Sequence, residues 1–380
     1  MSEIRVNNLS NESSTGGPTI SGITTFSGTN FFVPPVGDTA QRPENPQKGA
    51  IRFNTDSKHL EYFKGDTIGW SEVEASHGQL GGGTGSNAGT GARGVFFGRA
   101  TPTITNMIDF VTIPTFGDAQ DFGDMSGVSY TYGTTSSKVR GFCAGGSNPH
   151  ADVIDFITFS STGNATDTGN LTQARYQLAG GVNDSTRSIF GGGDHYGSPN
   201  AHYDILDYIT SATGGNAVDF GNLTGSKRMC AAMSSSTRGI FAGGNPSGGQ
   251  ENVIEYITIS TLGNSSNFGD MSYTLKEGRG CSNSTRGLIA GGYSPNVNTI
   301  EYITMATFGN TVDFGDMTLA RSHFASSSSQ TRALFASALG NQTSIDAVEI
   351  LTVGNAKDFG DLTDGGHNAD GTSNAHGGLG

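Results

Sequence analysis

Charge, cysteine and long apolar runs are all scarce in this sequence. Charged residues make up 14% of its 380 positions, and Asp and Glu outnumber Lys and Arg by 34 to 21. The net charge of −13 argues against a whole-chain nucleic-acid binder, because such proteins present basic surfaces. No apolar run approaches the roughly 18 residues of a membrane-spanning helix, and the opening residues lack the apolar segment of a signal peptide. We therefore expect no nucleic-acid partner, no membrane insertion and assembly in a reducing cytoplasm.

Metal-binding and catalytic patterns are also missing. The three cysteines, Cys143, Cys230 and Cys281, are widely spaced and odd in number, which fits neither a metal site nor a disulfide framework. We expect them to be small buried side chains. The eight histidines show no metal-ligand spacing, and neither a nucleophile elbow nor a P-loop occurs. The sequence thus predicts no metal, no cofactor and no enzymatic activity.

Residues that favour helices do not accumulate at helical spacing. Glycine is abundant instead, with 59 residues, and 22 Phe and 11 Tyr can build a core. This composition predicts an all-β chain with many turns.

Three motifs recur six times from residue 93 onward. The first is a basic residue followed by small and apolar residues, usually ending in glycines, and it begins at Arg93, Arg140, Arg187, Arg238, Arg286 and Arg332. The second runs aliphatic, acidic, usually aromatic, aliphatic, Thr, with its acidic residue at Asp109, Asp155, Asp207, Glu255, Glu301 and Glu349. The third, DFGDM or a variant of it, begins at Asp121, Asp167, Asp219, Asn267, Asp313 and Asp358.

A fourth stretch, rich in small residues, leads from each unit into the next. Each unit of about 47 residues therefore holds four short strands, and six units around an axis can bury faces that one unit cannot. That arrangement is a β-propeller. Residues 77–90 and residues 365–380 both look like the small-residue strand of the first unit, the latter with His376 where the repeat Arg would stand. We expect the two ends of the repeat region to be clasped together, because a ring must hide its end strands.

The order of an apolar strand with Gly-Gly, a strand with Tyr and a short closing strand resembles the kelch repeat over residues 77–380. The resemblance implies a six-bladed kelch-like β-propeller. The sequence departs from kelch in the closing strand, where Phe replaces Trp, and Trp70 lies outside the repeats. The DFG triplets are no kinase signature, since no Gly-rich loop, Lys strand or HRD segment accompanies them. We expect their Gly to permit a turn and their Phe to pack between blades.

The recurring carboxylates need recurring partners, and the six repeat arginines are the natural candidates. We predict that each Arg of the first motif forms a bidentate ion pair with the carboxylate of the second motif. The alternative is an ion or ligand site on the axis.

One long loop accounts for the largest step between repeats. Its Asp194, His195, Tyr196, Asn200 and His202 are candidate ligand-binding residues. Variable segments that follow the first motif should lie on one face, and their Asn, Ser, Tyr and Gly are typical of an adaptable binding surface. Neutral loop variation is the alternative explanation.

The N-terminal residues differ in character from the repeats. Residues 1–40 predict an extended arm, residues 41–75 a β-hairpin module with a turn at 55–58 and an aromatic end at Trp70, and residues 76–380 the propeller. Strands are expected where Ile51 and Phe53, and Leu60 and Tyr62, alternate with polar residues. A lone hairpin is marginal in water, so it must dock on something.

Both N-terminal pieces resemble virion proteins of tailed phages of the marine and cyanobacterial type. SEIRVNNLSNESSTGGPTISG is similar to their N-terminal arms, and GAIRFNTDSKHLEYFKGDTIGW to a module near the start of many tail-fibre proteins. The resemblance implies a non-enzymatic tail fibre or tail accessory protein located in the virion. It also implies attachment to other virion proteins through the arm, homo-oligomers (a trimer is our guess) and contact with a host-surface glycan. The alternatives are a capsid decoration protein, a lectin-like receptor-binding module and a glycan-degrading enzyme.

Overall fold

The computed structural model describes residues 34–57, 59–67, 69–72, 92–100, 103–130, 132–147, 151–195, 201–247 and 249–379. The chain divides into two compact units, Met1–His77 and Gly78–Gly380, which we describe separately. Its described residues form an all-β protein, with short 3-10 helices at η1 (Thr39–Gln41) and η2 (Gly377–Leu379) as the helical elements. Within them, no helix has the length and apolar character needed to cross a membrane.

The first unit contains one four-stranded sheet, in the order β1 (Val36–Gly37), β2 (Ile51–Asn54), β3 (His59–Phe63), β4 (Trp70–Glu72). The β2–β3 pair is the predicted hairpin, with Ile51 opposite Tyr62. Ile51 is exposed, however, and the polar face carries the buried Arg52, Asn54 and Glu61. Glu61 tolerates burial because Arg42 and Asn54 donate hydrogen bonds to its carboxylate and Arg52 lies 3.5 Å from it.

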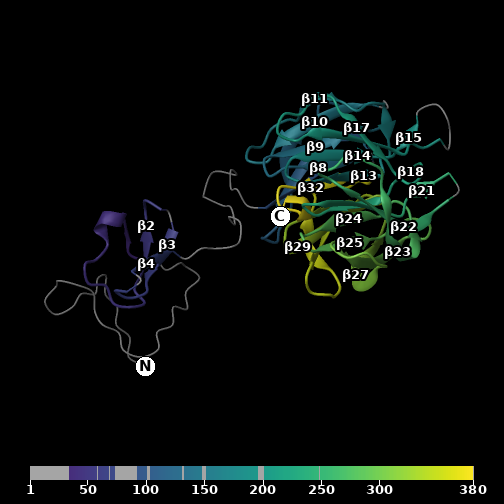
Figure 1. Ribbon diagram of the computed structural model, residues 1–380. Helices are drawn as coiled ribbons and strands as arrows, with labels where there is room; N and C mark the ends of the chain where they lie inside the picture. The colour runs from purple at the N-terminus through teal and green to yellow at the C-terminus, as the bar shows by residue number, and fades with distance from the viewer. Residues whose placement is uncertain are drawn as a thin grey trace. The chain divides into compact units, whose positions relative to one another are not determined.

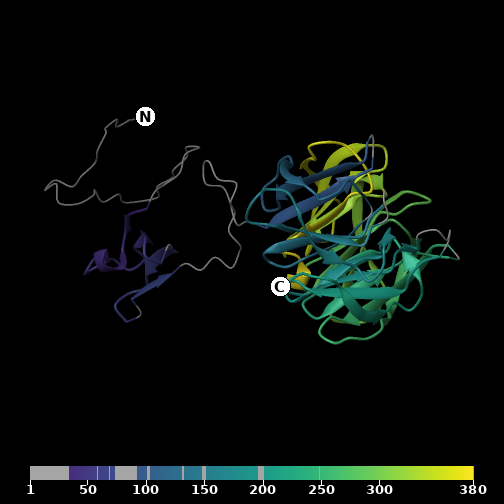
Figure 2. The same ribbon diagram turned by 90° about the horizontal axis from the view of Figure 1, so that it is seen from above.

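The described part of the second unit contains six four-stranded antiparallel sheets, which we number 1 to 6 (Figures 1 and 2). Their first strands, for sheets 1 to 6, are β32 (Asp370–Ser373), β8 (Gly133–Ser136), β13 (Gly180–Asn183), β19 (Ala231–Ser234), β24 (Arg279–Ser282) and β28 (Ala325–Ser328). The second strands are β5 (Arg93–Arg99), β9 (Arg140–Ala144), β14 (Arg187–Gly191), β20 (Arg238–Ala242), β25 (Arg286–Ala290) and β29 (Arg332–Ala338).

The remaining two strands of each sheet complete the order first, second, third, fourth. The third strands are β6 (Thr105–Thr112), β10 (Val153–Thr158), β16 (Ile205–Thr210), β22 (Glu251–Thr258), β26 (Val297–Thr304) and β30 (Gln342–Glu349). The fourth strands are β7 (Gln120–Asp124), β11 (Thr166–Asn170), β17 (Val218–Asn222), β23 (Ser266–Leu275), β27 (Val312–Arg321) and β31 (Lys357–Asp361). Two small sheets join β12 (Arg175–Tyr176) to β15 (Asp194–His195), and β18 (Lys227–Arg228) to β21 (Asn245–Pro246).

The two ends of the repeat region meet in sheet 1. The C-terminal strand β32 pairs with β5, placing Asp370 opposite Phe97 and Ser373 opposite Gly94, and Figure 2 shows the yellow C-terminal strand beside the blue start of the unit. This pairing confirms the expected clasp. Residues 77–90, the other candidate for this strand, lie outside the described residues.

The first strands also contact one another in a closed cycle, β32–β8–β13–β19–β24–β28 and back to β32. Apolar side chains fill the space between neighbouring sheets, as where Phe96 of sheet 1 packs with Leu334 and Phe359 of sheet 6. In Figure 1, sheet 2 runs from β11 at the edge of the unit to β8 toward its middle. The small side chains of the first strands allow this close approach.

The glycine of each DFG-type motif lies inside the fourth strand, so the expectation that it permits a turn was wrong. A Cβ on Gly123 would lie 2.5 Å from the backbone of Gly163 in the next sheet, and a Cβ on Gly360 would lie 2.5 Å from that of Gly117. The same contact recurs from each sheet to the next. Glycine is required because two backbones touch there. The neighbouring Phe is buried, as predicted.

The sixth copy of the second motif is shifted from its predicted position. Asp346, not Glu349, faces Asp358 of the fourth strand, as Asp109 faces Asp121 in sheet 1. Ala347 stands in the aromatic position and Glu349 in the place of Thr. This substitution disguised the motif in the sequence.

Candidate functional site

The recurring carboxylates fix the crossover from one sheet to the next. Asp207 of sheet 3 accepts hydrogen bonds from the backbone N–H of Thr172 at 3.1 Å and from its hydroxyl at 2.8 Å. Thr172 begins the crossover from sheet 2 to sheet 3. The corresponding pairs are Ser126–Asp155, Thr224–Glu255, Ser272–Glu301, Thr318–Asp346 and Thr363–Asp109. A Ser or Thr directly after the third motif in all six copies was the sequence signal for this contact.

Four of these carboxylates carry a cation that the first motif does not supply. Their pairs are Arg99–Asp109, Arg175–Asp207, Lys227–Glu255 and Arg321–Asp346, all with buried cations. In sheets 2 and 5, tyrosines lie near the carboxylate instead. Burial raises the pKa of Tyr132 and of Tyr273, and Asp155 and Glu301 respectively add to the effect. Both phenols therefore stay neutral beside their carboxylates.

The predicted pairing of the repeat arginines with these carboxylates was therefore wrong in sheets 1 to 5. Each repeat Arg stacks on an aromatic ring, with 4.3 Å between Arg286 and the Tyr302 ring centroid and 4.8 Å between Arg93 and that of Phe110. Its guanidinium also donates to a backbone carbonyl of the next sheet. These bonds are Arg93–Phe159, Arg140–Ala212, Arg187–Ile259, Arg238–Met305, Arg286–Ile350 and Arg332–Ile113.

Strand register explains both the failures and the exception. The repeat Arg lies opposite the last residue of the second motif, as Arg140 lies opposite Thr158, so the carboxylate is three residues away along the strand. In sheet 6 that last residue is Glu349, and Arg332 Nη2 lies 2.8 Å from its carboxylate. This exposed pair forms between two predicted residues, but Glu349 occupies the Thr position.

The long loop is held at its base by an internal ionic network. Asp194 forms a hydrogen bond with the His202 ring and an ion pair with Arg228, and Arg228 also donates to Gln177. The backbone of His195 pairs with Arg175 in β15–β12, while Tyr196 and Asn200 lie outside the described residues. Two of the predicted ligand-binding side chains, Asp194 and His202, thus contact each other at the base of the loop.

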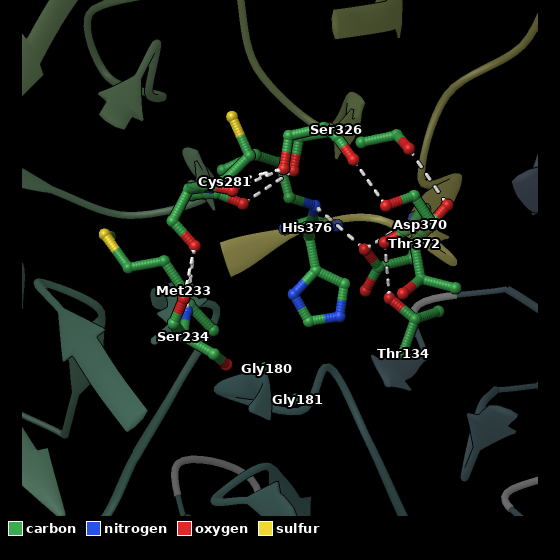
Figure 3. A pocket seen from close by; sticks show the side chains of 18 of the residues that line it. Thr134, Gly180, Gly181, Met233, Ser234, Cys281, Ser326, Asp370, Thr372 and His376 are labelled. Atoms are coloured by element: carbon green, nitrogen blue, oxygen red, sulfur yellow. Dashed lines mark hydrogen bonds and ion pairs between the residues drawn. The ribbon is translucent and has the colours of Figure 1, made fainter. Parts of the chain in front are cut away.

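A cavity of about 60 Å³ lies between the six first strands, where the alternative expectation placed an ion or ligand site, although the sequence did not predict its lining residues (Figure 3). Thr134, Ser234, Ser326, Asp370 and His376 contribute polar atoms to its wall. The last residue of each first strand links to the next through hydrogen bonds in the order Ser136, Asn183, Ser234, Ser282, Ser328, Ser373 and back to Ser136. The volume suits a few water molecules.

His376 occupies one end of this cavity, within the C-terminal plug formed by residues 374–379. Its Nε2 lies 2.8 Å from the Ser136 hydroxyl, and its Nδ1 accepts from the Gly378 N–H at 3.1 Å. Part of the ring faces the cavity, but the protein surrounds it, and burial lowers the pKa of His376 to about 4. The imidazole is therefore neutral near pH 7, with its proton on Nε2.

The other end carries charged side chains. Arg279 Nε lies 3.6 Å from the Asp370 carboxylate, whose pKa is raised by burial and lowered in part by Arg279. Nearby, His323 Nε2 lies 2.5 Å from Glu277. Left-handed residues surround this end, namely Gln177, Met229, Glu277, His323 and Asn368, and their backbones are hydrogen-bonded in sequence. The side chains thus pair with one another across neighbouring sheets.

Within the residues that the structure describes, no group of three or more His, Cys, Asp or Glu side chains is arranged to hold a metal ion. Cys143, Cys230 and Cys281 are free and buried. No protein-family model matches the chain, and no curated protein matches it either.

Proposed function

We propose that the chain is a non-enzymatic structural protein of a tailed-phage particle, of tail-fibre or tail-accessory type. Its second unit would be a six-bladed kelch-like β-propeller, with sheets 1 to 6 as the blades. The cyclic contacts of the first strands and the pairing of β32 with β5 support this architecture. A capsid decoration protein of the same architecture is the alternative placement.

The observation that carries the proposal is how the recurring charged groups are used. All six recurring carboxylates bind the crossover that leads into their own sheet, and all six repeat arginines bind the next sheet. These contacts stabilise a rigid body. The recurring charged groups therefore serve contacts within the fold. A rigid body that displays loops suits a protein of surface contact.

Attachment and display belong to different parts of the chain in this proposal. The arm at residues 1–40 would attach to other virion proteins, as its resemblance to phage arms implies. The loops at the ends of the sheets would contact the host surface. In the second candidate function, the loop anchored by Asp194, His202 and Arg228 binds a host glycan, because a fixed base lowers the entropy cost of ordering the loop around a ligand.

Labelling purified virions with an antibody against residues 92–379 tests the proposal. Label at the tail supports the tail assignment, and label over the head supports the decoration protein. Absence of the chain from purified particles would refute both. For the second candidate, glycan-array binding by the wild-type chain that is lost on replacing Arg228 with Gln, but kept on replacing Lys138 with Gln, would assign the lectin role to the loop.

A further inference from the structure

The turns at one end of the six sheets have a distinct composition. In an antiparallel sheet, the turns between strands one and two and between strands three and four lie at the same end. Eleven such turns lie at this end, together with the segment 374–376 that follows the first strand of sheet 1. We call these segments the twelve turns: residues 114–118, 137–139, 160–164, 184–186, 211–216, 235–237, 260–264, 283–285, 306–310, 329–331, 350–355 and 374–376. They contain three charged residues, Lys138, Asp118 and Asp184, and their formal charge sums to −1 against −13 for the whole chain. The turns are therefore close to neutral on a strongly acidic protein, and the repeat arginines lie beside them.

Large apolar side chains project from four of the turns between strands three and four. Phe116, Leu262, Phe308, Leu351 and Val353 are 56, 57, 57, 62 and 55% exposed, and we call them the apolar arc. They belong to sheets 1, 4, 5 and 6, which are neighbours. Gly309, Gly354 and Gly117 of these turns donate backbone hydrogen bonds to sheets 4, 5 and 6 respectively. The arc is thus continuous across four sheets.

The fold itself does not require these apolar residues. Sheets 2 and 3 have Thr162 and Gly214 at the position of Phe116, Leu262, Phe308 and Val353. The turn of sheet 2 still docks on its neighbour, since Gly163 donates to Phe122 at 2.7 Å much as Gly309 donates to Phe268 at 3.0 Å. A threonine therefore serves the turn equally well. Stacking on Arg332 and Arg238 accounts for part of the role of Phe116 and Phe308, whereas the exposure of Leu262, Leu351 and Val353 needs another reason.

We propose that the apolar arc is the surface through which two copies of this chain associate face to face. Arg238 and Arg332 stack on Phe308 and Phe116, and interface cores are rich in aromatic side chains and Arg and poor in Lys, Glu and Asp. Two chains of net charge −13 repel each other on most approaches, and the end with nearly neutral turns is where they meet with the least repulsion. A twofold axis lets one arc cover the other. The inference holds for any function of the chain, since it rests on the turns alone.

Sedimentation velocity of the full chain from 1 to 100 µM tests the proposal. We expect the wild type to reach twice the monomer mass of 39.3 kDa within this range. Replacing Leu262, Leu351 and Val353 together with Thr introduces the residue that sheet 2 already has at Thr162, and it should weaken association at least about tenfold. Leu262, Leu351 and Val353 lie on turn tips, so the melting temperature should stay unchanged and show that the variant folds.

A matched control replaces Leu319 and Leu339 with Thr. Both are exposed but lie outside the twelve turns, so this variant should associate like the wild type. Salt should strengthen association in the wild type, because it screens the repulsion between acidic chains. A wild type that stays monomeric at 100 µM, or an oligomer of any size that survives the triple substitution, would overturn the proposal.

Discussion

Sheet 1 and sheet 3 have the same strand order and a buried carboxylate paired with a cation, but the first strand and the cation come from different parts of the chain. In sheet 3 all four strands follow one another along the chain, and the cation for Asp207 is Arg175 of the crossover. In sheet 1 the first strand comes from the C-terminus, and the cation for Asp109 is Arg99 of its own second strand. Gly366 lies beside that Arg99, and a Cβ there would come within 2.7 Å of the Arg99 Cβ. Where the carboxylate has a buried cation, the chain can thus supply that cation from either direction.

The largest expected effect on stability comes from removing the C-terminal strand of sheet 1. Deleting residues 370–380 takes away β32 and the plug, exposing the edge of β5 and one side of the cavity. We expect the second unit to lose its cooperative thermal transition, because the stabilisation lost with β32 and the plug exceeds the roughly 5–15 kcal/mol by which domains are stable. Circular dichroism melts of this variant, beside one lacking residues 1–11, measure it. A transition within a few degrees of the wild type would show that sheet 1 does not depend on its C-terminal strand.

The next largest effect is the loss of unfolding free energy when Arg175 or Arg99 is replaced. Arg175→Met leaves Asp207 buried without its cation and should cost about 3–5 kcal/mol of unfolding free energy, and Arg99→Met should cost a similar amount. Adding Asp207→Asn to the first variant should recover part of the loss, since no charge is then left unpaired. Glu301 of sheet 5 has no such cation, and the nearby Tyr273 comes from β23 of sheet 4. Tyr273→Phe removes one hydrogen bond to Gly291 and should cost about 1 kcal/mol. Urea unfolding gives all four values, and equal losses for Arg175→Met and Tyr273→Phe would contradict this account.

Acid should weaken sheet 1 more than the others, because the plug contributes His376 where the turns of sheets 2 to 6 have Val139, Thr186, Thr237, Thr285 and Thr331. This position comes one residue before the repeat Arg, so the expectation that His376 takes the place of that Arg was wrong. The folded pKa of His376 is about 4, against about 6.5 in an unfolded chain. The unfolded state therefore takes up a proton first, so the stabilisation is complete above about pH 6.5 and is lost as the pH falls towards 4. The linked change is at most about 3 kcal/mol. His376→Gln should flatten the urea midpoint between pH 6.5 and 4.5; an unchanged pH dependence would count against the assigned burial.

The smallest effect concerns the crossover hydroxyls. Thr172→Val in sheet 3 and Thr363→Val in sheet 1 each remove one O–H donor to a buried carboxylate while keeping shape and the backbone N–H bond. Each should cost about 1–2 kcal/mol. Denaturant midpoints measured beside Thr352→Val, an exposed turn residue, test the equality of the two sheets.

Much of the fold was predictable from the repeat pattern of the sequence. Strand positions, the C-terminal clasp and the burial of Phe122 and its equivalents follow from motifs that recur at regular spacing. The cations of the carboxylates were missed because Arg99, Arg175, Lys227 and Arg321 do not share one repeat position. The polar inner face of the first unit was missed for a different reason, since a buried Glu61 is acceptable only with partners that lie far along the chain.

The pairing of β5 also has a mechanical consequence. Any pull transmitted through the chain that precedes Ala92 reaches the repeat unit at Arg93, the first residue of β5. That strand is held on both sides, by β6 and by β32. A force along its axis loads both hydrogen-bond ladders at once, so they share it and must rupture together. The C-terminal strand β32 therefore shares with β6 the tension that arrives through the N-terminal segment.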